Sequence, residues 1–326
     1  MSCTNAKGAL EERPLFWYTT TRHCSFSMKG KLMSFFSYLI NGISLGSVYA
    51  IIALGYTMVY GIAKMLNFAH GDVIMIGSYV VFSIVSMANL PTFVGIILAV
   101  VLCTILGITI EAIAYRPLRQ AASSLAVLIT AIGVSYFLQN IALLIFGANT
   151  KAFSSVVTVP PISLFDGQVT ITGETIVTII SCIIIMILLT LFVNKTKAGQ
   201  AMQAVSEDKG AAQLMGINVN STISLTFAIG SALAAVAGML LCSSYPSLTP
   251  YTGSMPGIKA FVAAVFGGIG SIPGALIGGL ILGIIEILSK AYISSQMADA
   301  IVFLVLIVIL VIKPTGILGK QIQEKV

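Results

Sequence analysis

A polar segment early in the chain carries its densest group of ionisable and amide side chains. Asn67, His70 and Asp72 bring an amide, an imidazole and a carboxylate together between two strongly apolar runs. An ionisable group at membrane depth costs about 2.5–3.5 kcal/mol on insertion scales, so such groups face a bundle interior or a cavity and are retained for a function. Gly71 and Gly77 interrupt the same segment, which is typical of the broken helices at transport sites.

The chemistry open to this segment is narrow. The sequence holds only two histidines, His23 and His70, and its five cysteines form no Cys-x-x-Cys pair, so no metal site and no cofactor are predicted. No nucleophile accompanies His70 and Asp72, so no catalytic residues are expected. Two interpretations stay open: these side chains line a translocation pathway, or they hydrogen-bond backbone groups that a helix break leaves free.

A second glycine-rich segment lies in the other half of the chain. It contains Gly267, Gly268, Gly270 and Pro273 between two apolar runs, and Lys259 precedes it as another lysine precedes the first segment. No Gly-Lys-Ser/Thr follows, which excludes a phosphate-binding loop and favours a turn within the membrane. Broken segments at matching places in two halves indicate a pseudo-symmetric repeat with a pathway near the membrane midplane.

Composition places both segments in a membrane. The 326 residues are 57% hydrophobic and 9% charged, with a mean hydropathy of +1.02, whereas soluble domains carry about 25% charged residues. The apolar runs predict an all-α polytopic membrane protein with about 8–9 transmembrane helices, some of them broken or re-entrant. The net charge of +6 lies in short basic patches between these runs, which is typical of cytoplasmic loops and indicates no nucleic-acid partner.

Polarity also divides the chain. Residues 1–32 are polar without a long apolar run, and we expect a poorly ordered tail that a later start methionine would omit. Residues 33–319 form the membrane domain, and residues 320–326 are a polar C-terminal tail. The basic loop at residues 115–119, the polar loop at residues 194–220 and the C-terminus are expected in the cytoplasm. Because three apolar runs precede the first of these loops, the N-terminus is expected outside.

Several motifs, taken together, resemble one family of transport proteins. In chain order they are Leu66-Asn67-Phe68-Ala69-His70-Gly71-Asp72, Tyr115-Arg116-Pro117, Ser206-Glu207-Asp208, Met215-Gly216-Ile217-Asn218, Lys259-Ala260-Phe261, Gly267-Gly268-Ile269-Gly270-Ser271-Ile272-Pro273-Gly274-Ala275 and Pro314-Thr315-Gly316-Ile317-Leu318-Gly319. From about residue 33 to the C-terminus, the chain resembles the permeases of high-affinity branched-chain amino acid ABC transporters, of the LIV-H type.

The resemblance implies an ATP-driven importer of leucine, isoleucine and valine in the bacterial inner membrane. The implied partners are a second, different permease subunit, two cytoplasmic ATPase subunits, an extracytoplasmic substrate-binding protein and the lipid bilayer. This chain would be a transport subunit and not an enzyme. A permease of the same family for urea, short amides or other amino acids is the alternative. An ion-coupled transporter or channel that uses His70 and Asp72 as a proton relay is an alternative of another class.

Within such an importer, residues 194–220 resemble the coupling loop that docks on an ATPase. Alanines and other apolar residues recur there at helical spacing, which predicts a basic, amphipathic pair of helices. The coupling residues expected from the resemblance are Glu207, Asp208, Ala211, Ala212 and Gly216. The family's leading glutamate is replaced by Gly210. The first polar segment is then expected to be a broken helix that lines or gates the pathway, with its side chains holding the break in shape.

Overall fold

Long apolar helices dominate the computed structural model, which describes residues 14–120, 124–153, 155–157, 159–164 and 169–319. Within these residues, seven helices are long and apolar enough to cross a membrane, and two more apolar helices are shorter. The predicted all-α polytopic class is confirmed, whereas the count of 8–9 crossings and the repeat stay predictions. Of the expected tails, residues 1–13 and 320–326 lie outside the described residues, and the backbone is helical from Pro14.

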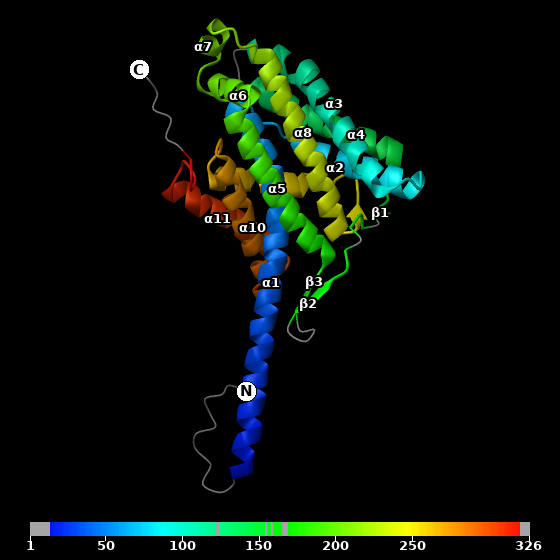
Figure 1. Ribbon diagram of the computed structural model, residues 1–326, viewed down its shortest axis with the longest axis vertical. Helices are drawn as coiled ribbons and strands as arrows, with labels where there is room; N and C mark the ends of the chain where they lie inside the picture. Colours follow the sequence, from blue (N-terminus) through cyan, green and yellow to red (C-terminus); the bar gives the residue numbers. More distant parts are fainter. Residues whose placement is uncertain (1–13, 121–123, 154, 158, 165–168, 320–326) are drawn as a thin grey trace.

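The elements follow one another along the chain with few strands between them (Figure 1). The helices are α1 (Pro14–Ala63), α2 (His70–Phe82), α3 (Thr92–Ile110), α4 (Ser124–Phe146), α5 (Gly173–Lys195), α6 (Lys197–Glu207), α7 (Lys209–Leu214), α8 (Val219–Ser244), α9 (Ser254–Gly267), α10 (Ile272–Tyr292) and α11 (Ala298–Ile312). Short π-helical turns, η1 (Ser83–Met87) and η2 (Glu111–Tyr115), end α2 and α3, and a 3-10 turn, η3 (Pro117–Gln120), follows. Two antiparallel strand pairs join β1 (Lys151–Ala152) to β4 (Ser247–Leu248) and β2 (Ile162–Leu164) to β3 (Val169–Ile171).

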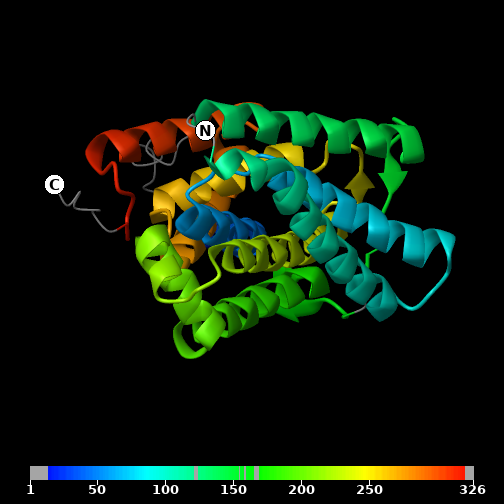
Figure 2. The ribbon, with the colours of Figure 1, turned by 90° about the horizontal axis from the view of Figure 1, so that it is seen from above.

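Helix α1 is the centre of the bundle. Seen from above, it lies inside a ring of other helices (Figure 2), and it contacts α5, α8, α9 and α10. From Leu45 to Ala63 its side chains are buried almost without interruption. A helix that is apolar on all faces has no side to show to water, which is why this one forms the core of the protein.

Small residues bring α1 and α10 into close contact. A methyl group added at Gly46 of α1 would lie 2.8 Å from the Cα atom of Leu280 and 2.9 Å from the carbonyl oxygen of Gly279. Ala50 lies one turn after Gly46 on α1, and a methyl group on Gly279 of α10 would lie 2.5 Å from its Cα atom. Because lipid tails are as apolar as leucine, helices in a membrane associate through such close packing and not through a hydrophobic driving force.

The bundle has two distinct ends. At one end, which we call the α7 end, Lys209 of α7 donates from Nζ to the carbonyl oxygen of Ala63, 2.9 Å away, at the close of α1. At the other, the hairpin end, strands β1 to β4 gather, and the rings of Tyr38 and Tyr292 meet with centroids 5.9 Å apart (Figure 1). Helix α1 therefore runs from the hairpin end to the α7 end. Which of these ends faces the cytoplasm stays a prediction.

We expect Gly46→Leu to destabilise the bundle by about 1–3 kcal/mol, because the new side chain forces α1 and α10 apart. The midpoint of thermal unfolding of the purified protein in detergent measures this loss. Gly133→Leu on α4 is the matched control, since a methyl group there meets nothing within 4 Å. Equal unfolding midpoints for the two variants would contradict close packing at this interface.

Candidate functional site

The helix breaks between α1 and α2. Helix α1 ends at Ala63, α2 begins at His70, and residues 64–69 leave the helical path, with Lys64 at a φ of 57°. The backbone is nevertheless hydrogen-bonded as α2 starts, because the amide of His70 donates to the carbonyl of Asn67 and the amide of Asp72 to the carbonyl of Ala69. In a membrane such non-helical backbone is tolerated only where protein or a water-filled cavity surrounds it.

Asn67 holds this break to the end of α3. Its side-chain Oδ1 accepts a 2.9 Å hydrogen bond from the hydroxyl of Tyr115, and both residues are buried. Tyr115 is the last residue of the π-helical turn η2. A π turn is rare and shifts the side chains that follow it. The bond therefore fixes the break against α3, a structural role for Asn67.

His70 fills the space that Gly55 leaves open in α1. A methyl group at Gly55 would lie 2.6 Å from His70 Nε2, and the imidazole packs on the ring of Tyr56 with centroids 4.6 Å apart. His70 is 1% exposed, and its Nε2 has no hydrogen-bond partner within the described part of the chain. His70 therefore packs the start of α2 against α1, where it also hydrogen-bonds the backbone of Ile52.

Asp72 joins three helices. It is 2% exposed in the first turn of α2, and its Oδ1 accepts a 2.9 Å hydrogen bond from Nε2 of Gln139 on α4. The same nitrogen lies 3.3 Å from the hydroxyl of Ser135 and 3.4 Å from that of Ser254, which begins α9. We call these four residues the Asp72 cluster. A carboxylate is favourable here because the first turn of a helix carries partial positive charge.

The starts of α2 and α9 touch through glycines. A methyl group on Gly257 would lie 2.9 Å from the Cα atom of Gly71, and one on Gly71 would lie 2.7 Å from the carbonyl oxygen of Gly253. Further along α2, a methyl group on Gly77 would lie 2.7 Å from the Cα atom of Ala235 on α8. Two helix N-termini thus meet inside the protein, and Asp72 supplies negative charge at that point.

The second glycine-rich segment forms a tight turn between α9 and α10. Gly268 and Gly270 have φ values of 102° and 94°, a region that side chains rarely adopt. The hydroxyl of Ser271 caps α10 through the amide of Gly274, with Pro273 in the first turn. The carbonyl of Gly267 accepts a hydrogen bond from the amide of Leu318 in the segment after α11.

The structure does not bring the two glycine-rich segments into one site. The turn at residues 267–274 lies at the α7 end, where Gly270 approaches Gly61 near the close of α1. Gly71 meets the opposite end of α9, a helix of 14 residues and thus about 21 Å long. The predicted pathway residues therefore mark both ends of α9.

The polar loop between α5 and α8 contains two helices. Asp208 caps α7, because its Oδ1 accepts hydrogen bonds from the amides of Gly210 and Ala211 at 2.7 and 3.0 Å. Ala212 is buried while Glu207 is exposed. Gly216 turns the chain towards α8 with a φ of 83°, and a methyl group there would meet nothing within 4 Å.

The tip of this loop carries apolar side chains that the sequence interpretation did not single out as contact residues. Leu214 and Met215 are 90% and 83% exposed. A methionine beside a leucine is an adaptable apolar surface, common where proteins meet partners. The sequence feature that could have indicated this exposure is the position of both residues at the end of an otherwise amphipathic helix.

A group of paired charges around the buried Lys259 and Glu286 was also missed. Lys259 Nζ on α9 lies 2.8 Å from Glu286 Oε1 on α10 and 2.6 Å from Asp299 Oδ1 on α11. Lys290 Nζ lies 2.6 Å from the same Glu286 oxygen, and the hydroxyl of Tyr49 on α1 donates to the other oxygen at 2.9 Å. We call these five residues the charge network. The spacing of Glu286 and Lys290, one helical turn apart, was the local signal.

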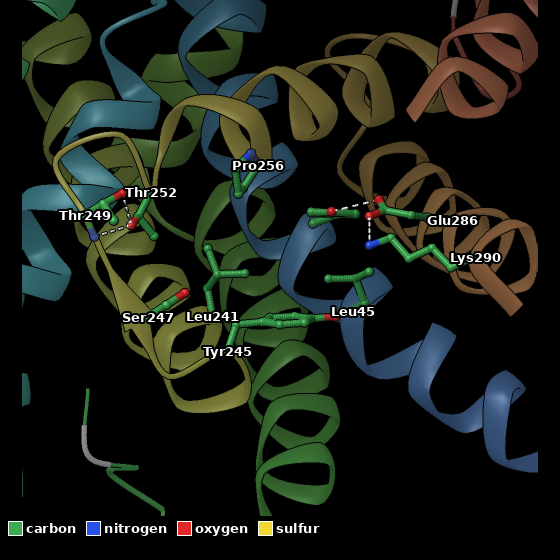
Figure 3. A pocket seen from close by; sticks show the side chains of 10 residues that line it. Leu45, Leu241, Tyr245, Ser247, Thr249, Thr252, Pro256, Glu286 and Lys290 are labelled. Atoms are coloured by element: carbon green, nitrogen blue, oxygen red, sulfur yellow. Dashed lines mark hydrogen bonds and ion pairs between the residues drawn. The ribbon is translucent and has the colours of Figure 1, made fainter. Parts of the chain in front are cut away.

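A cavity of about 350 Å³ adjoins the charge network (Figure 3). Its walls come from α1, α8, α9, α10 and the segment that contains β4. The lining residues are Leu45, Tyr49, Leu241, Tyr245, Ser247, Thr249, Thr252, Pro256, Glu286 and Lys290. The cavity lies towards the hairpin end, because β4 pairs with β1 there. Burial and the Glu286 carboxylate raise the pKa of Tyr245, which keeps its hydroxyl protonated.

Comparison with known proteins identifies the family. A family model described as "Branched-chain amino acid transport system / permease component" matches residues 38–310, and the chain belongs to this family. The high-affinity branched-chain amino acid transport system permease protein LivH of Escherichia coli K12 is 46% identical over 317 residues, covering 92% of this chain and 100% of that protein.

Two further relatives are similar along most of their length. The permease protein BraD of Pseudomonas aeruginosa, from a high-affinity branched-chain amino acid transport system, is 44% identical, covering 88% of this chain and 97% of that protein. A probable branched-chain amino acid transport permease protein of Methanocaldococcus jannaschii is 30% identical, covering 84% and 89%. The resemblance drawn from the motifs is therefore confirmed.

We expect Asp72→Leu to reduce the amount of folded protein and the rate of uptake, while the ratio of leucine to valine uptake stays unchanged. Loss of a hydrogen bond to a buried charged group costs about 1.5–3 kcal/mol. Asp72→Asn is the matched variant, because an amide oxygen still accepts from Gln139, and it should keep most of the uptake. A changed ratio in either variant would instead place Asp72 in contact with the substrate.

Proposed function

We propose that this chain is the membrane-spanning permease of an ATP-driven importer that moves branched-chain amino acids across the bacterial inner membrane. The observation that carries the proposal is the family match across residues 38–310, together with relatives that align along their whole length. The seven long apolar helices are what such a permease requires. The chain is a transport subunit and not an enzyme, and ATP hydrolysis belongs to separate subunits.

The importer that we propose contains a second, different permease subunit, two ATPase subunits and an external binding protein. Permeases of ABC importers work with ATPase and binding-protein partners in general. The two ends of this chain fit an ATPase contact on one side of the membrane and a binding-protein contact on the other. The α7 end offers a projecting helix pair, and the hairpin end offers strands beside a cavity (Figure 1).

Helices α6 and α7 are the proposed ATPase contact. The exposed Leu214 and Met215 would enter an apolar groove on the partner, while the caps of α7 keep it rigid. Lys209 couples α7 to α1, because its Nζ donates a hydrogen bond to the last carbonyl of α1, directly before the helix break. A displacement of α7 by the ATPase would thus be transmitted to the break between α1 and α2.

Two other functions make different demands. A permease of the same family for urea or short amides would need no apolar surface for a side chain, so leucine would not compete with its substrate. An ion-coupled transporter would need a titrating relay. Within the described residues, His70 contacts Tyr56 and the Ile52 backbone, Asp72 contacts Gln139 and Ser135, and neither forms an ion pair.

Uptake into proteoliposomes tests the proposal. We expect the complex that purifies with this chain, supplied with ATP and its binding protein, to accumulate radiolabelled leucine. Leu214→Asp combined with Met215→Asp should lower uptake about tenfold or more, because an apolar contact is lost to two charges. The neighbouring exposed Gln213→Glu is the control and should keep full uptake. Accumulation driven by a proton gradient without ATP, or uptake of urea in preference to leucine, would overturn the proposal.

A further inference from the structure

The cavity has one charged wall. Glu286 Oε1 accepts from both Lys259 and Lys290, and Oε2 accepts from Tyr49. The Glu286 side chain is 2% exposed, whereas the side chain of Lys290 is 35% exposed and reaches the cavity (Figure 3). An ammonium group has three donors, and the contact with Glu286 uses one of them. Lys290 can therefore hold a carboxylate in the cavity while it stays paired with Glu286.

The other side of the cavity carries hydroxyl groups. Figure 3 shows Thr249 and Thr252 on the segment across from Glu286 and Lys290, with Ser247 on the same segment. The hydroxyls of Thr249 and Thr252 lie 3.1 Å apart, and that of Thr252 accepts from the amide of Thr249 at 2.7 Å. Such hydroxyls bind polar ends without adding charge.

Apolar side chains complete the lining. Leu45 of α1 and Leu241 of α8 are 5% exposed, and with Pro256 they offer a surface for an aliphatic group. Binding pockets for small molecules are roughly 300–1,000 Å³ and combine an apolar lining with a few placed polar groups. At about 350 Å³, this cavity is at the small end of that range and suits a compact ligand.

The charge balance favours a ligand without net charge. The charge network pairs two lysines with two carboxylates, from Glu286 and Asp299. A lone anion or cation would disturb this balance beside the nearly buried Glu286, which is costly. A zwitterion brings one charge of each sign and can match Lys290 and Glu286 together.

We propose that this cavity is a transient substrate subsite for an L-α-amino acid with a small aliphatic side chain. Lys290 binds the α-carboxylate, Glu286 accepts from the α-ammonium group, and Leu45 and Leu241 contact the side chain. The inference rests on the proposed function and adds a place where substrate first meets this chain. The cavity suits that role because it lies towards the hairpin end.

The position of the subsite also links it to the helix break. Pro256 lines the cavity and belongs to the first turn of α9. Ser254, in the same turn, lies within 3.4 Å of Gln139 in the Asp72 cluster. The first turn of α9 therefore contributes both to the cavity and to the contacts of the Asp72 cluster.

Direct binding tests the subsite. Radiolabelled leucine is bound to the purified membrane complex without its binding protein, and unlabelled leucine, leucinamide and 4-methylpentanoate compete. We expect leucinamide, which lacks the carboxylate, and 4-methylpentanoate, which lacks the ammonium group, to compete about tenfold or more less well than leucine. Equal competition by all three ligands, or no leucine binding by the unaltered complex, would overturn the inference.

Variants separate a binding role from a structural one. Lys290→Gln should weaken leucine and 4-methylpentanoate about tenfold and leave leucinamide unchanged. Thr252→Trp should weaken all three by filling the cavity. Lys195→Gln is the control, an exposed lysine at the α7 end of α5, and should bind leucine normally. Leucine binding that Lys290→Gln and Thr252→Trp leave unchanged, or an equal loss of all three ligands in Lys290→Gln, would refute the subsite.

Parallel uptake assays keep the two proposals distinct. If the unaltered complex shows ATP-driven leucine uptake but Lys290→Gln and Thr252→Trp bind leucine normally, the subsite fails and the proposed function stands. If the unaltered complex transports no leucine with ATP and binding protein, the proposed function fails and the subsite with it.

Discussion

Charge buried at membrane depth has to be paired, and the arrangement of the second half of this protein follows from that constraint. Lys259 is 6% exposed and Glu286 is 1% exposed, so neither is solvated by water. Their 2.8 Å contact joins α9 to α10, and the further contacts of Asp299 and Tyr49 draw in α11 and α1. Removing either residue takes compensation away from the buried charge that is left, which is destabilising. The charge network therefore fixes the side of the cavity that α1 and α10 form.

The same constraint governs the helix break in the first half. Residues 64–69 leave the helical path, and Asn67, Asp72 and the first amides of α2 find partners on other elements or nearby backbone. Gly71 and Gly257 let the starts of α2 and α9 touch. Two of these polar side chains, Asn67 and Asp72, thereby tie the start of α2 to other helices through Tyr115 and Gln139.

Much of this architecture follows from local sequence pattern. The apolar runs predicted the membrane-spanning helices, and alanines at helical spacing predicted the pair α6 and α7. The glycines and polar groups near His70 marked the helix break. Each of these signals is contained in a few turns of chain, so a single sequence is enough to detect it.

Partners that are distant in sequence could not be predicted in this way. Tyr49 and Glu286 are 237 positions apart, and Gln139 and Asp72 are 67 apart, so no spacing connects them. The two glycine-rich segments were expected to serve one pathway, but only the path of α9 shows that they lie at its opposite ends. The exposure of Leu214 and the cavity beside Lys290 likewise depend on how the helices pack.

The most direct test of this account is a double-mutant cycle on Lys259 and Glu286, read as the free energy of unfolding of the purified protein in detergent. Lys259→Met takes one of two lysines from Glu286, and Glu286→Leu takes one of two carboxylates from Lys259, so each change should cost up to about 3–5 kcal/mol. The double variant removes both charges and should cost much less than the sum of the two single changes, with an interaction energy above about 1 kcal/mol. Additive losses would contradict the claim that pairing of buried charge holds these helices together.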